Sequence, residues 1–278
     1  MPGMSVGEAL AEARRALGSR SDTAGMDAQV VLAEIAGRSR EWLLAHPEAR
    51  LLPGQQSGFS SALQRLEEGE PLAYVLGWWE FYGRRFRVTP DVLIPRPETE
   101  LLVDTALETL ARRPAGTRVV DLGTGSGCVA ITLALEVPST RLLATDLSPA
   151  ALHIARDNVR RHGVVGRIGF ARVDLAQGLA LEDAVLVANL PYVPVGETAS
   201  LRFEPRLALE AGDDGLALVR RLLDQFGVCR PKRTTVLLEI GAGQGGRLHE
   251  MAGARCSPLT LWVSPDLAGR DRVLGLEF

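Results

Sequence analysis

From Thr117 onwards, short runs of apolar and β-branched residues alternate with stretches of helical periodicity. Repetition of a buried strand and a helix is typical of a parallel sheet that is covered on both faces. The pattern predicts strands over 117–122, 141–145, 167–172, 184–189, 234–240, 258–263 and 272–277, with helices over 126–137, 149–162, 213–228 and 243–253. Residues 264–271 leave no room for a crossover helix, so the last two strands are expected to pair antiparallel. The predicted fold class is therefore α/β, with a seven-stranded sheet.

The N-terminal part of the chain has a different pattern, in which short amphipathic stretches end at glycines. Ser5 and Glu8 have the spacing of a capping box, and apolar residues then recur on one helical face as far as Gly18. Further helices are predicted over 28–36, 41–45 and 59–66, which together indicate a small helical bundle. Because the bundle carries no chemical group of its own, residues 1–76 are expected to form a substrate-recognition domain.

A short segment joins this bundle to the α/β part of the chain. Aromatic residues alternate around a glycine-containing turn over 78–88, which predicts a β-hairpin. Prolines then give an extended segment, and a helix is expected from Glu98 to Leu110. We therefore assign 77–98 to a hairpin and linker and 99–278 to the α/β domain.

Composition limits the classes of function. The 278 residues are 46% hydrophobic and 23% charged, as in a soluble globular protein, and the net charge of −3 gives no overall attraction to nucleic acid or anionic lipid. No stretch approaches the roughly 18 apolar residues of a membrane helix, and the start does not resemble a signal peptide. The three cysteines are widely separated, with no histidine at ligand spacing, so no metal site is expected. These features predict a cytoplasmic protein without metal, and we expect it to be a monomer.

The first strand of the α/β part ends in a glycine-rich loop, Gly123-Thr124-Gly125-Ser126-Gly127. Glycines let a ligand approach the backbone closely and expose amides at the start of a helix, which suits a small adenosine-type cofactor. A tight turn without a ligand is the alternative interpretation. No Gly-Lys-Ser/Thr follows, so phosphoryl transfer is disfavoured.

Acidic residues end the next two strands. Asp146 follows Gly123 by roughly 20 positions, where a carboxylate accepts hydrogen bonds from ribose hydroxyls. Ser148 is available to cap the helix that starts at Pro149, which leaves Asp146 free for a ligand. Asp174 could meet an adenine amino group, and a turn role for it is equally consistent with the sequence.

Two kinds of enzyme use such a framework. Nicotinamide dehydrogenases usually space their glycines Gly-x-Gly-x-x-Gly and need a proton-transferring side chain, whereas this loop is Gly-x-Gly-x-Gly and no such lysine is available. Methyl transfer from S-adenosylmethionine fits better. The sulfonium is already an activated leaving group, so the protein must chiefly place a nucleophile in line with it.

A polar and aromatic tetrapeptide, Asn189-Leu190-Pro191-Tyr192, follows the fourth strand. In isolation it is more often a proline turn. An amide or exocyclic amino nitrogen is a poor nucleophile, and acceptors aimed at its hydrogens orient it for attack. The Asn189 side chain and the Leu190 backbone carbonyl are candidates for those acceptors, while Tyr192 offers a stacking ring and Pro191 fixes the turn.

The chain resembles the HemK/PrmC family of protein-glutamine N5-methyltransferases, which modify peptide chain release factors. The matching motifs are Gly69-Glu70-Pro71, Glu80-Phe81-Tyr82-Gly83, the segment 93–100, the loop 121–127, the tetrapeptide 189–192 and Leu238-Glu239-Ile240-Gly241. The resemblance implies a class I, Rossmann-like methyltransferase sheet with a small N-terminal helical bundle. It also implies S-adenosylmethionine as cofactor and the glutamine of a Gly-Gly-Gln motif in a release factor as substrate.

The resemblance further implies a role for individual positions. Residues 123–127 would hold the methionine and ribose, Asp146 the ribose hydroxyls, and Asp174 and Leu175 would lie near the adenine. Asn189 would orient the substrate amide with Tyr192 beside it. Phe81, Pro97 and Thr99 would line the methyl-donor pocket.

Two other functions remain open from the sequence. An N6-adenine or other nucleic-acid methyltransferase would need a basic path to Tyr192, which Arg84, Arg85 and Arg87 could begin. Paired arginines occur elsewhere in the chain too, so direct nucleic-acid binding is not expected. The other is a cofactor-binding interaction protein that has lost catalytic activity because Leu190 stands where the family has proline.

Overall fold

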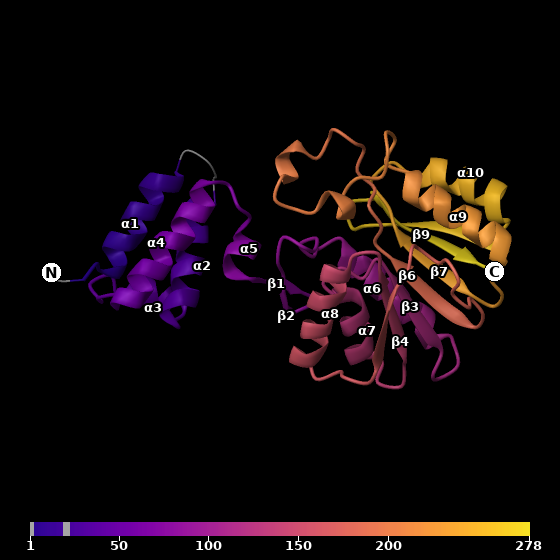
Figure 1. Cartoon of the computed structure of the whole chain (residues 1–278), viewed down its shortest axis with the longest axis horizontal. Helices are drawn as coiled ribbons and strands as arrows, with labels where there is room; N and C mark the ends of the chain where they lie inside the picture. The colour runs from indigo at the N-terminus through magenta and orange to yellow at the C-terminus, as the bar shows by residue number, and fades with distance from the viewer. Residues whose placement is uncertain (1–2, 19–22) are drawn as a thin grey trace. The chain divides into compact units, whose positions relative to one another are not determined.

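The computed structural model describes residues 3–18 and 23–278, and the chain divides into two compact units, Met1–Trp78 and Trp79–Phe278. The first unit contains α1 (Val6–Leu17), α2 (Ala24–Ala36), α3 (Arg40–Ala45), α4 (Pro53–Glu67) and α5 (Leu72–Leu76), which pack around an apolar core of their own (Figure 1). The predicted capping box is present, because Ser5 Oγ accepts from Glu8 N at 3.2 Å and Glu8 Oε2 accepts from Ser5 N at 2.6 Å. The helical bundle is confirmed.

Helix boundaries in this unit differ from the prediction. α4 starts at Pro53 rather than at residue 59, because its first turn is polar and carries no apolar periodicity, although proline suits a first helical position. α2 starts at Ala24 rather than at residue 28. The short α5 was not predicted.

The second unit is built on a seven-stranded sheet, which confirms the α/β class. Its strands are β3 (Arg118–Leu122), β4 (Leu142–Asp146), β5 (Ile168–Arg172), β6 (Ala184–Ala188), β7 (Thr235–Glu239), β8 (Thr260–Pro265) and β9 (Asp271–Glu277). Their order is β5-β4-β3-β6-β7-β9-β8, and the first five in this order pair parallel. β9 pairs antiparallel with both β7 and β8, as expected for the last two strands.

Helices cover both faces of the sheet, and alternate residues of each strand serve the two cores. α6 (Thr99–Ala111), α7 (Cys128–Glu136) and α8 (Pro149–Arg161) lie on one face, and α9 (Ala217–Cys229) and α10 (Gly245–Cys256) on the other (Figure 1). In β6, Val185 and Val187 join the first core, whereas Ala184, Leu186 and Ala188 join the second. All five are fully buried, which explains why this strand is a continuous apolar run.

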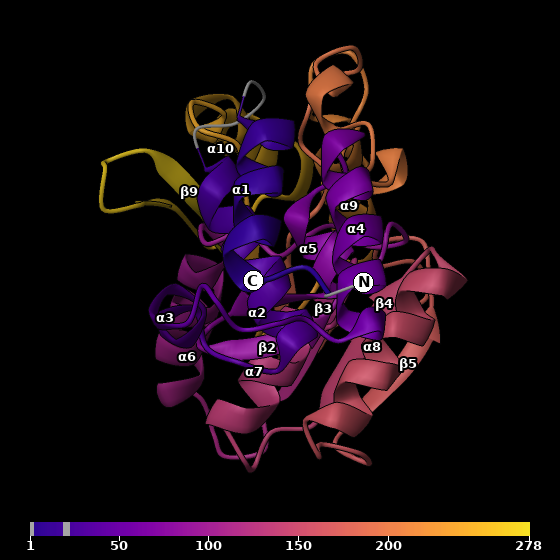
Figure 2. The ribbon, with the colours of Figure 1, turned by 90° about the vertical axis from the view of Figure 1, so that its left-hand side faces the viewer.

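The last two strands form a hairpin whose loop projects from the sheet (Figure 2, yellow). Trp262 on β8 lies directly opposite Gly275 on β9, and a side chain at Gly275 would meet the indole ring at 2.1 Å. The ring therefore replaces the missing side chain and fixes the register of the edge strand. None of the described helices is long and apolar enough to cross a membrane.

The predicted hairpin is also present, as β1 (Trp78–Phe81) and β2 (Arg84–Arg87). Its turn residues Tyr82 and Gly83 both have positive φ, 52° and 67°, as a two-residue type I′ turn requires. Phe81 and Phe86 are buried in the same core as α6 and α7.

Asn158 on α8 ties this hairpin to the glycine loop. Its Oδ1 accepts from Arg87 N at 2.8 Å, and its Nδ2 donates to Arg87 O at 3.0 Å and to Ser126 O at 2.8 Å. The Asn158 side chain is fully buried and its bond to Ser126 O is buried too, so water does not readily replace this partner. One amide thus holds β2 and the glycine loop against the same helix.

We expect Asn158→Ala to lower the free energy of unfolding by about 3 kcal/mol, because it leaves buried backbone groups without partners. Urea denaturation followed by circular dichroism measures the loss. Arg161→Ala, an exposed position on the same helix, is the control and should change stability by less than about 0.5 kcal/mol. Equal stability of the two variants would contradict the role assigned to Asn158.

Candidate functional site

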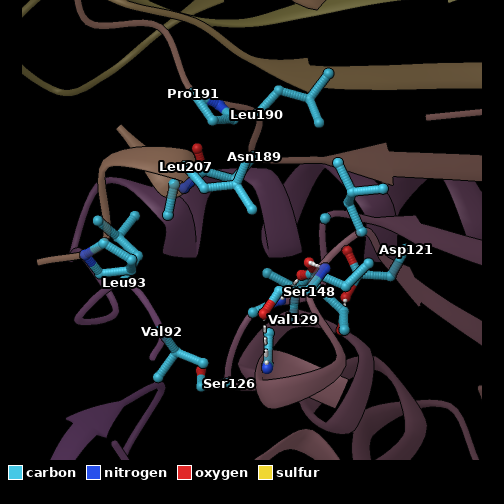
Figure 3. A pocket seen from close by; sticks show the side chains of 18 of the residues that line it. Val92, Leu93, Asp121, Ser126, Val129, Ser148, Asn189, Leu190, Pro191 and Leu207 are labelled. Atoms are coloured by element: carbon cyan, nitrogen blue, oxygen red, sulfur yellow. Dashed lines mark hydrogen bonds between the residues drawn. The ribbon is translucent and has the colours of Figure 1, made fainter. Parts of the chain in front are cut away.

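A cavity of about 240 Å³ lies at the carboxyl ends of the parallel strands (Figure 3). The chain leaves β3 towards β4 on one side, while β6 pairs with β3 on the other, so the cavity sits where the strand order reverses. Open α/β sheets bind their ligands at such a point. The predicted site residues that line it are Thr99, Gly123, Thr124, Gly125, Ser126, Asp146, Asp174, Leu175, Asn189, Leu190 and Pro191.

Four predicted site residues do not line the cavity. Phe81 is 1% exposed and packs edge-on against Phe86 in the core, so the expected place at the donor pocket does not hold for it. Pro97 is exposed to solvent just before α6. Gly127 and Tyr192 are likewise not among the residues that line the cavity.

The three glycines of the loop have different tasks. Gly123 and Gly125 have φ of 70° and 54° and line the cavity, where the absence of side chains leaves the backbone open to a ligand. Gly127, with φ of 82°, is buried, and a Cβ there would lie 3.1 Å from Ala155 Cβ on α8. The third glycine therefore serves the close packing of α7 on α8 rather than ligand contact.

Asp146 is not free of protein partners, contrary to the prediction. Ser148 caps α8 as expected, accepting from Ala151 N at 3.2 Å, yet Asp146 also accepts from Ser148 N at 2.8 Å and from Gly125 N at 2.9 Å. Each carboxylate oxygen retains a second lone pair for a ligand hydroxyl. Burial raises the pKa of Asp146, and hydrogen bonds from Ser148 and Gly125 oppose that shift. The carboxylate thus shapes the glycine loop as well as facing the cavity.

The end of the cavity that Leu147 and Leu175 line is apolar. Leu147 is 42% exposed although it is a large apolar residue, and Leu175 lines the same cavity with a left-handed φ of 55°. Asp174 is paired with Arg221 at 2.6 Å, and both line the cavity. The flat face of an adenine ring would cover Leu147, so the residues present fit the adenosine part of S-adenosylmethionine.

Asp121 was not assigned a role from the sequence, although it lies in the loop motif. It is 2% exposed beneath the loop, and its carboxylate accepts from Thr124 Oγ1 at 2.6 Å. Burial raises the pKa of Asp121 to about 7, against the hydrogen bond from Thr124. Its hydrogen bond fixes the second residue of the glycine loop from below.

Asn189 lies at the cavity wall, held by a residue from another element. Its Nδ2 donates to Thr99 Oγ1, at the start of α6, over 3.0 Å. Because Nδ2 is engaged with Thr99, the acceptor Oδ1 is directed away from that residue. Figure 3 shows Asn189, Leu190 and Pro191 along one side of the cavity and Ser126, Val129 and Ser148 facing them.

Two further side chains, Tyr192 and Glu239, contact each other. The hydroxyl of Tyr192 lies 3.4 Å from Oε1 of Glu239, the last residue of β7, and burial raises the pKa of Tyr192 to about 12. Glu239 is 1% exposed, and burial raises its pKa to about 7, while hydrogen bonding by Thr99 and Tyr192 opposes that shift. Sequence reasoning included Glu239 in a family motif and gave it no role.

A third buried acid, Glu204, holds one side of the cavity together. Its Oε2 accepts from Ile94 N at 3.1 Å, its Oε1 pairs with Arg96, and it is 5% exposed. It lies between two short 3₁₀ helices, η1 (Ala199–Leu201) and η2 (Arg206–Ala208). This clamp joins the proline-rich linker to the loop after β6, so that Pro95 and Leu207 line the same cavity.

The described residues contain no cluster of three or more His, Cys, Asp or Glu side chains that could hold a metal ion. The cavity instead combines backbone, carboxylate and amide acceptors with apolar walls. Such a set can bind and orient a neutral or cationic ligand and a planar amide.

Known proteins similar to this chain agree with that chemistry. A family described as PrmC N-terminal domain matches residues 8–77, and one described as methyltransferase small domain matches residues 98–208. Release factor glutamine methyltransferase from Moorella thermoacetica is 41% identical over 97% of this chain and 97% of its own. The protein of the same name from Coxiella burnetii is 38% identical over 98% of both chains.

A solved structure, human methyltransferase 10 domain containing protein, is similar in fold. It superposes with a TM-score of 0.52 and 16% identity, covering 71% of this chain and 89% of its own. At that identity the likeness concerns the fold alone.

We expect Glu204→Ala to weaken binding of S-adenosylmethionine about tenfold, since loss of a buried charge-assisted contact costs about 1.5 kcal/mol or more. The amide hydrogen of Ile94 should also exchange faster with solvent. Calorimetry and hydrogen-exchange mass spectrometry measure the two effects. Glu197→Ala, an exposed position in the same loop, should change neither. Unchanged exchange at Ile94 in the Glu204 variant would rule out the clamp.

Proposed function

Because the chain belongs to the family of release factor glutamine methyltransferases, we propose that it transfers a methyl group from S-adenosylmethionine to the glutamine amide of the Gly-Gly-Gln motif in a peptide chain release factor. The observation that carries this proposal is the fixed orientation of Asn189, whose Nδ2 is held by Thr99 beside the glycine loop. An amide acceptor at that place suits an amide substrate.

The residues for the cofactor lie together along the cavity. Gly123 and Gly125 offer open backbone for the methionine part, Asp146 has lone pairs for the ribose hydroxyls, and Leu147 with Leu175 provides the apolar end for adenine. When bound, S-adenosylmethionine supplies a methyl group on a sulfonium, which is an activated leaving group. We assign Asp174 to the rim of the adenine site, held by Arg221.

The remaining chemistry is activation and placement of a weak nucleophile. The lone pair of a glutamine amide nitrogen is delocalised into its carbonyl. In our proposal, Asn189 Oδ1 and the Leu190 carbonyl accept the two amide hydrogens and favour the tetrahedral nitrogen that develops as the N–C bond forms and the S–C bond breaks. One amide hydrogen then leaves as a proton to solvent. Positioning of this kind contributes up to ~7–11 kcal/mol.

The contacts of the hairpin arginines disfavour nucleic acid as the substrate. Arg84 pairs with Glu136 at 2.6 Å, and Arg87 pairs with Asp157 on α8. A basic path to Tyr192 that began with these residues would first have to give up those carboxylates. We therefore propose a protein as the substrate, with no direct contact to nucleic acid.

The contacts of Leu190 disfavour the catalytically weak alternative. Leu190 is 5% exposed and packs in the core beside the sheet, so its backbone carbonyl is held without the proline ring. An inactive interaction protein is thus not required by the substitution.

The N-terminal unit is proposed to recognise the release factor. It matches the PrmC N-terminal domain over residues 8–77 and has a core of its own. We propose the division into 1–76 for recognition, 77–98 for hairpin and linker and 99–278 for methyl transfer, in a cytoplasmic monomer.

The substrate proposal predicts that labelled S-adenosylmethionine transfers its methyl group to a release factor with an intact Gly-Gly-Gln motif. A release factor whose motif glutamine is replaced by alanine should take up no label, because the nucleophile is absent. Scintillation counting and peptide mass spectrometry measure the transfer. Equal labelling of the two release factors would refute the proposal.

Asn189→Ala should reduce the methyl-transfer rate by about 10²–10³, the usual effect of losing one preorganised polar group at the reacting centre. The affinity for S-adenosylmethionine should fall only about threefold or less, since the other cavity contacts remain. Single-turnover kinetics and calorimetry separate the two effects. A variant as fast as the wild type would remove Asn189 from the mechanism.

A further inference from the structure

We propose that Glu239 is a positioning residue, whose carboxylate sets the direction of the hydrogen bonds through Thr99 so that Asn189 presents Oδ1 to the substrate amide. This inference rests on the proposed function and deepens it. It assigns a task to a buried acid that touches neither the cofactor cavity nor the substrate position, since Glu239 does not line the cavity.

The surroundings of Glu239 support such a task. It ends β7 and is 1% exposed, and Tyr192 approaches its Oε1 at 3.4 Å. Burial raises the pKa of Glu239, and both Thr99 and Tyr192 act against that shift by favouring the charged form. Its Oε2 has no hydrogen-bond partner, which is unusual for a buried carboxylate oxygen.

The number of hydrogens on each group determines the direction of the hydrogen bonds from Asn189 through Thr99. Thr99 Oγ1 already accepts from Asn189 Nδ2, so its single hydrogen needs an acceptor elsewhere. An ionised carboxylate can only accept, and the buried Oε2 of Glu239, which has no hydrogen-bond partner, is the acceptor that we assign to this hydroxyl. With the Thr99 hydrogen directed at Glu239, the oxygen of Thr99 can receive only the amide end of Asn189, and Oδ1 must face the cavity.

A neutral group at this position would remove that constraint. A protonated acid or an amide can donate to Thr99, and the Thr99 hydrogen is then free to point at Asn189. The Asn189 side chain could turn over, presenting Nδ2 to the substrate. Two N–H groups would then oppose the hydrogens of the glutamine amide, and the nucleophile would lose its orientation.

Burial of a charge is costly, which argues against a purely space-filling role. A Gln or Met side chain would fill the same volume without removing a carboxylate from water. The charge is supported by a small number of groups that face it from the surrounding elements. Arg272 on β9 favours the ionised form, whereas Glu98 before α6 disfavours it. The Tyr192 hydroxyl contacts the carboxylate, and burial and, to a smaller extent, the charge of Glu239 raise the pKa of the Cys128 thiol on α7.

The titration of Glu239 gives the expected pH dependence. Burial raises its pKa to about 7, so the acceptor-only form is lost as the pH falls through that value. Methyl transfer should therefore rise with pH and level off above about pH 8. The direction follows because the ionised form is the one that fixes Asn189.

Glu239→Gln tests the inference, because it keeps the shape of the side chain and replaces one acceptor by a donor. We expect the single-turnover rate on the release factor to fall about tenfold to a hundredfold, as for a misplaced reacting group. The Kd of S-adenosylmethionine and the KM of the release factor should stay within about threefold. The inflection of the rate near pH 7 should disappear. Glu250→Gln, an exposed position on α10, is the matched control and should keep the rate and pH profile of the wild type.

A pair of variants at Thr99 tests the same series of hydrogen bonds without changing Glu239. Thr99→Val removes the hydroxyl and should lose a similar factor in rate, whereas Thr99→Ser restores the hydroxyl and should recover most of that loss. A Glu239→Gln enzyme with wild-type rate and pH profile would overturn the inference. If Glu239→Gln does not fold, equal rates for the Val and Ser variants at Thr99 would overturn it instead. Failure of the proposed function is distinguishable, since the wild type itself would then not methylate the release factor.

Discussion

The parallel pairing of β3 with β6 is the constraint on which the site depends. Asp121 pairs with Val187 and Leu122 with Ala188, so both strands end at the same level. The glycine loop that follows β3 and the tetrapeptide that follows β6 consequently emerge side by side. A register slip of one residue would also move the apolar side chains of β6 to the wrong faces of a sheet that is buried on both, so the packing of both cores enforces the geometry of the site.

Tertiary contacts restrain the tetrapeptide 189–192, in which Leu190 stands where the family has proline. The Leu190 side chain approaches within 3.4 Å of the position that a Cβ on Gly123 would occupy. On the following residues, Gln244 Nε2 donates to the Tyr192 carbonyl at 3.2 Å, and Val193 N donates to Leu209 O at 3.0 Å. A proline restricts its own backbone torsion and that of the preceding residue, whereas these contacts fix the segment against neighbouring elements. The backbone carbonyl of Leu190 is thus positioned by packing.

Sequence patterns of a few residues predicted the strands and turns, because these depend mainly on interactions between residues that are close in the chain. Apolar runs and glycine loops identified the strands to within one or two residues, and β6 ends at Ala188 because the proline turn begins directly after it. The start of α9 was placed four residues too early, at 213 instead of Ala217. Asp214 accepts from Leu216 N at 3.1 Å there, and this turn resembles a helix start in sequence. Asp146 was expected to be free because Ser148 is available to cap α8. The two backbone partners that it has in the structure, Ser148 N and Gly125 N, lie in a turn and in another loop.

The sequence by itself determined the alternation of strands and helices, the cofactor loop and the amide at the end of β6, because periodicity, glycine and proline act over a few residues. Only the tertiary structure decided what Asn189 binds. Its partner Thr99 is 90 positions away in the chain, and Glu239 comes from a third element, β7. Hydrogen-bond direction depends on which groups share a buried volume, and no local pattern records that.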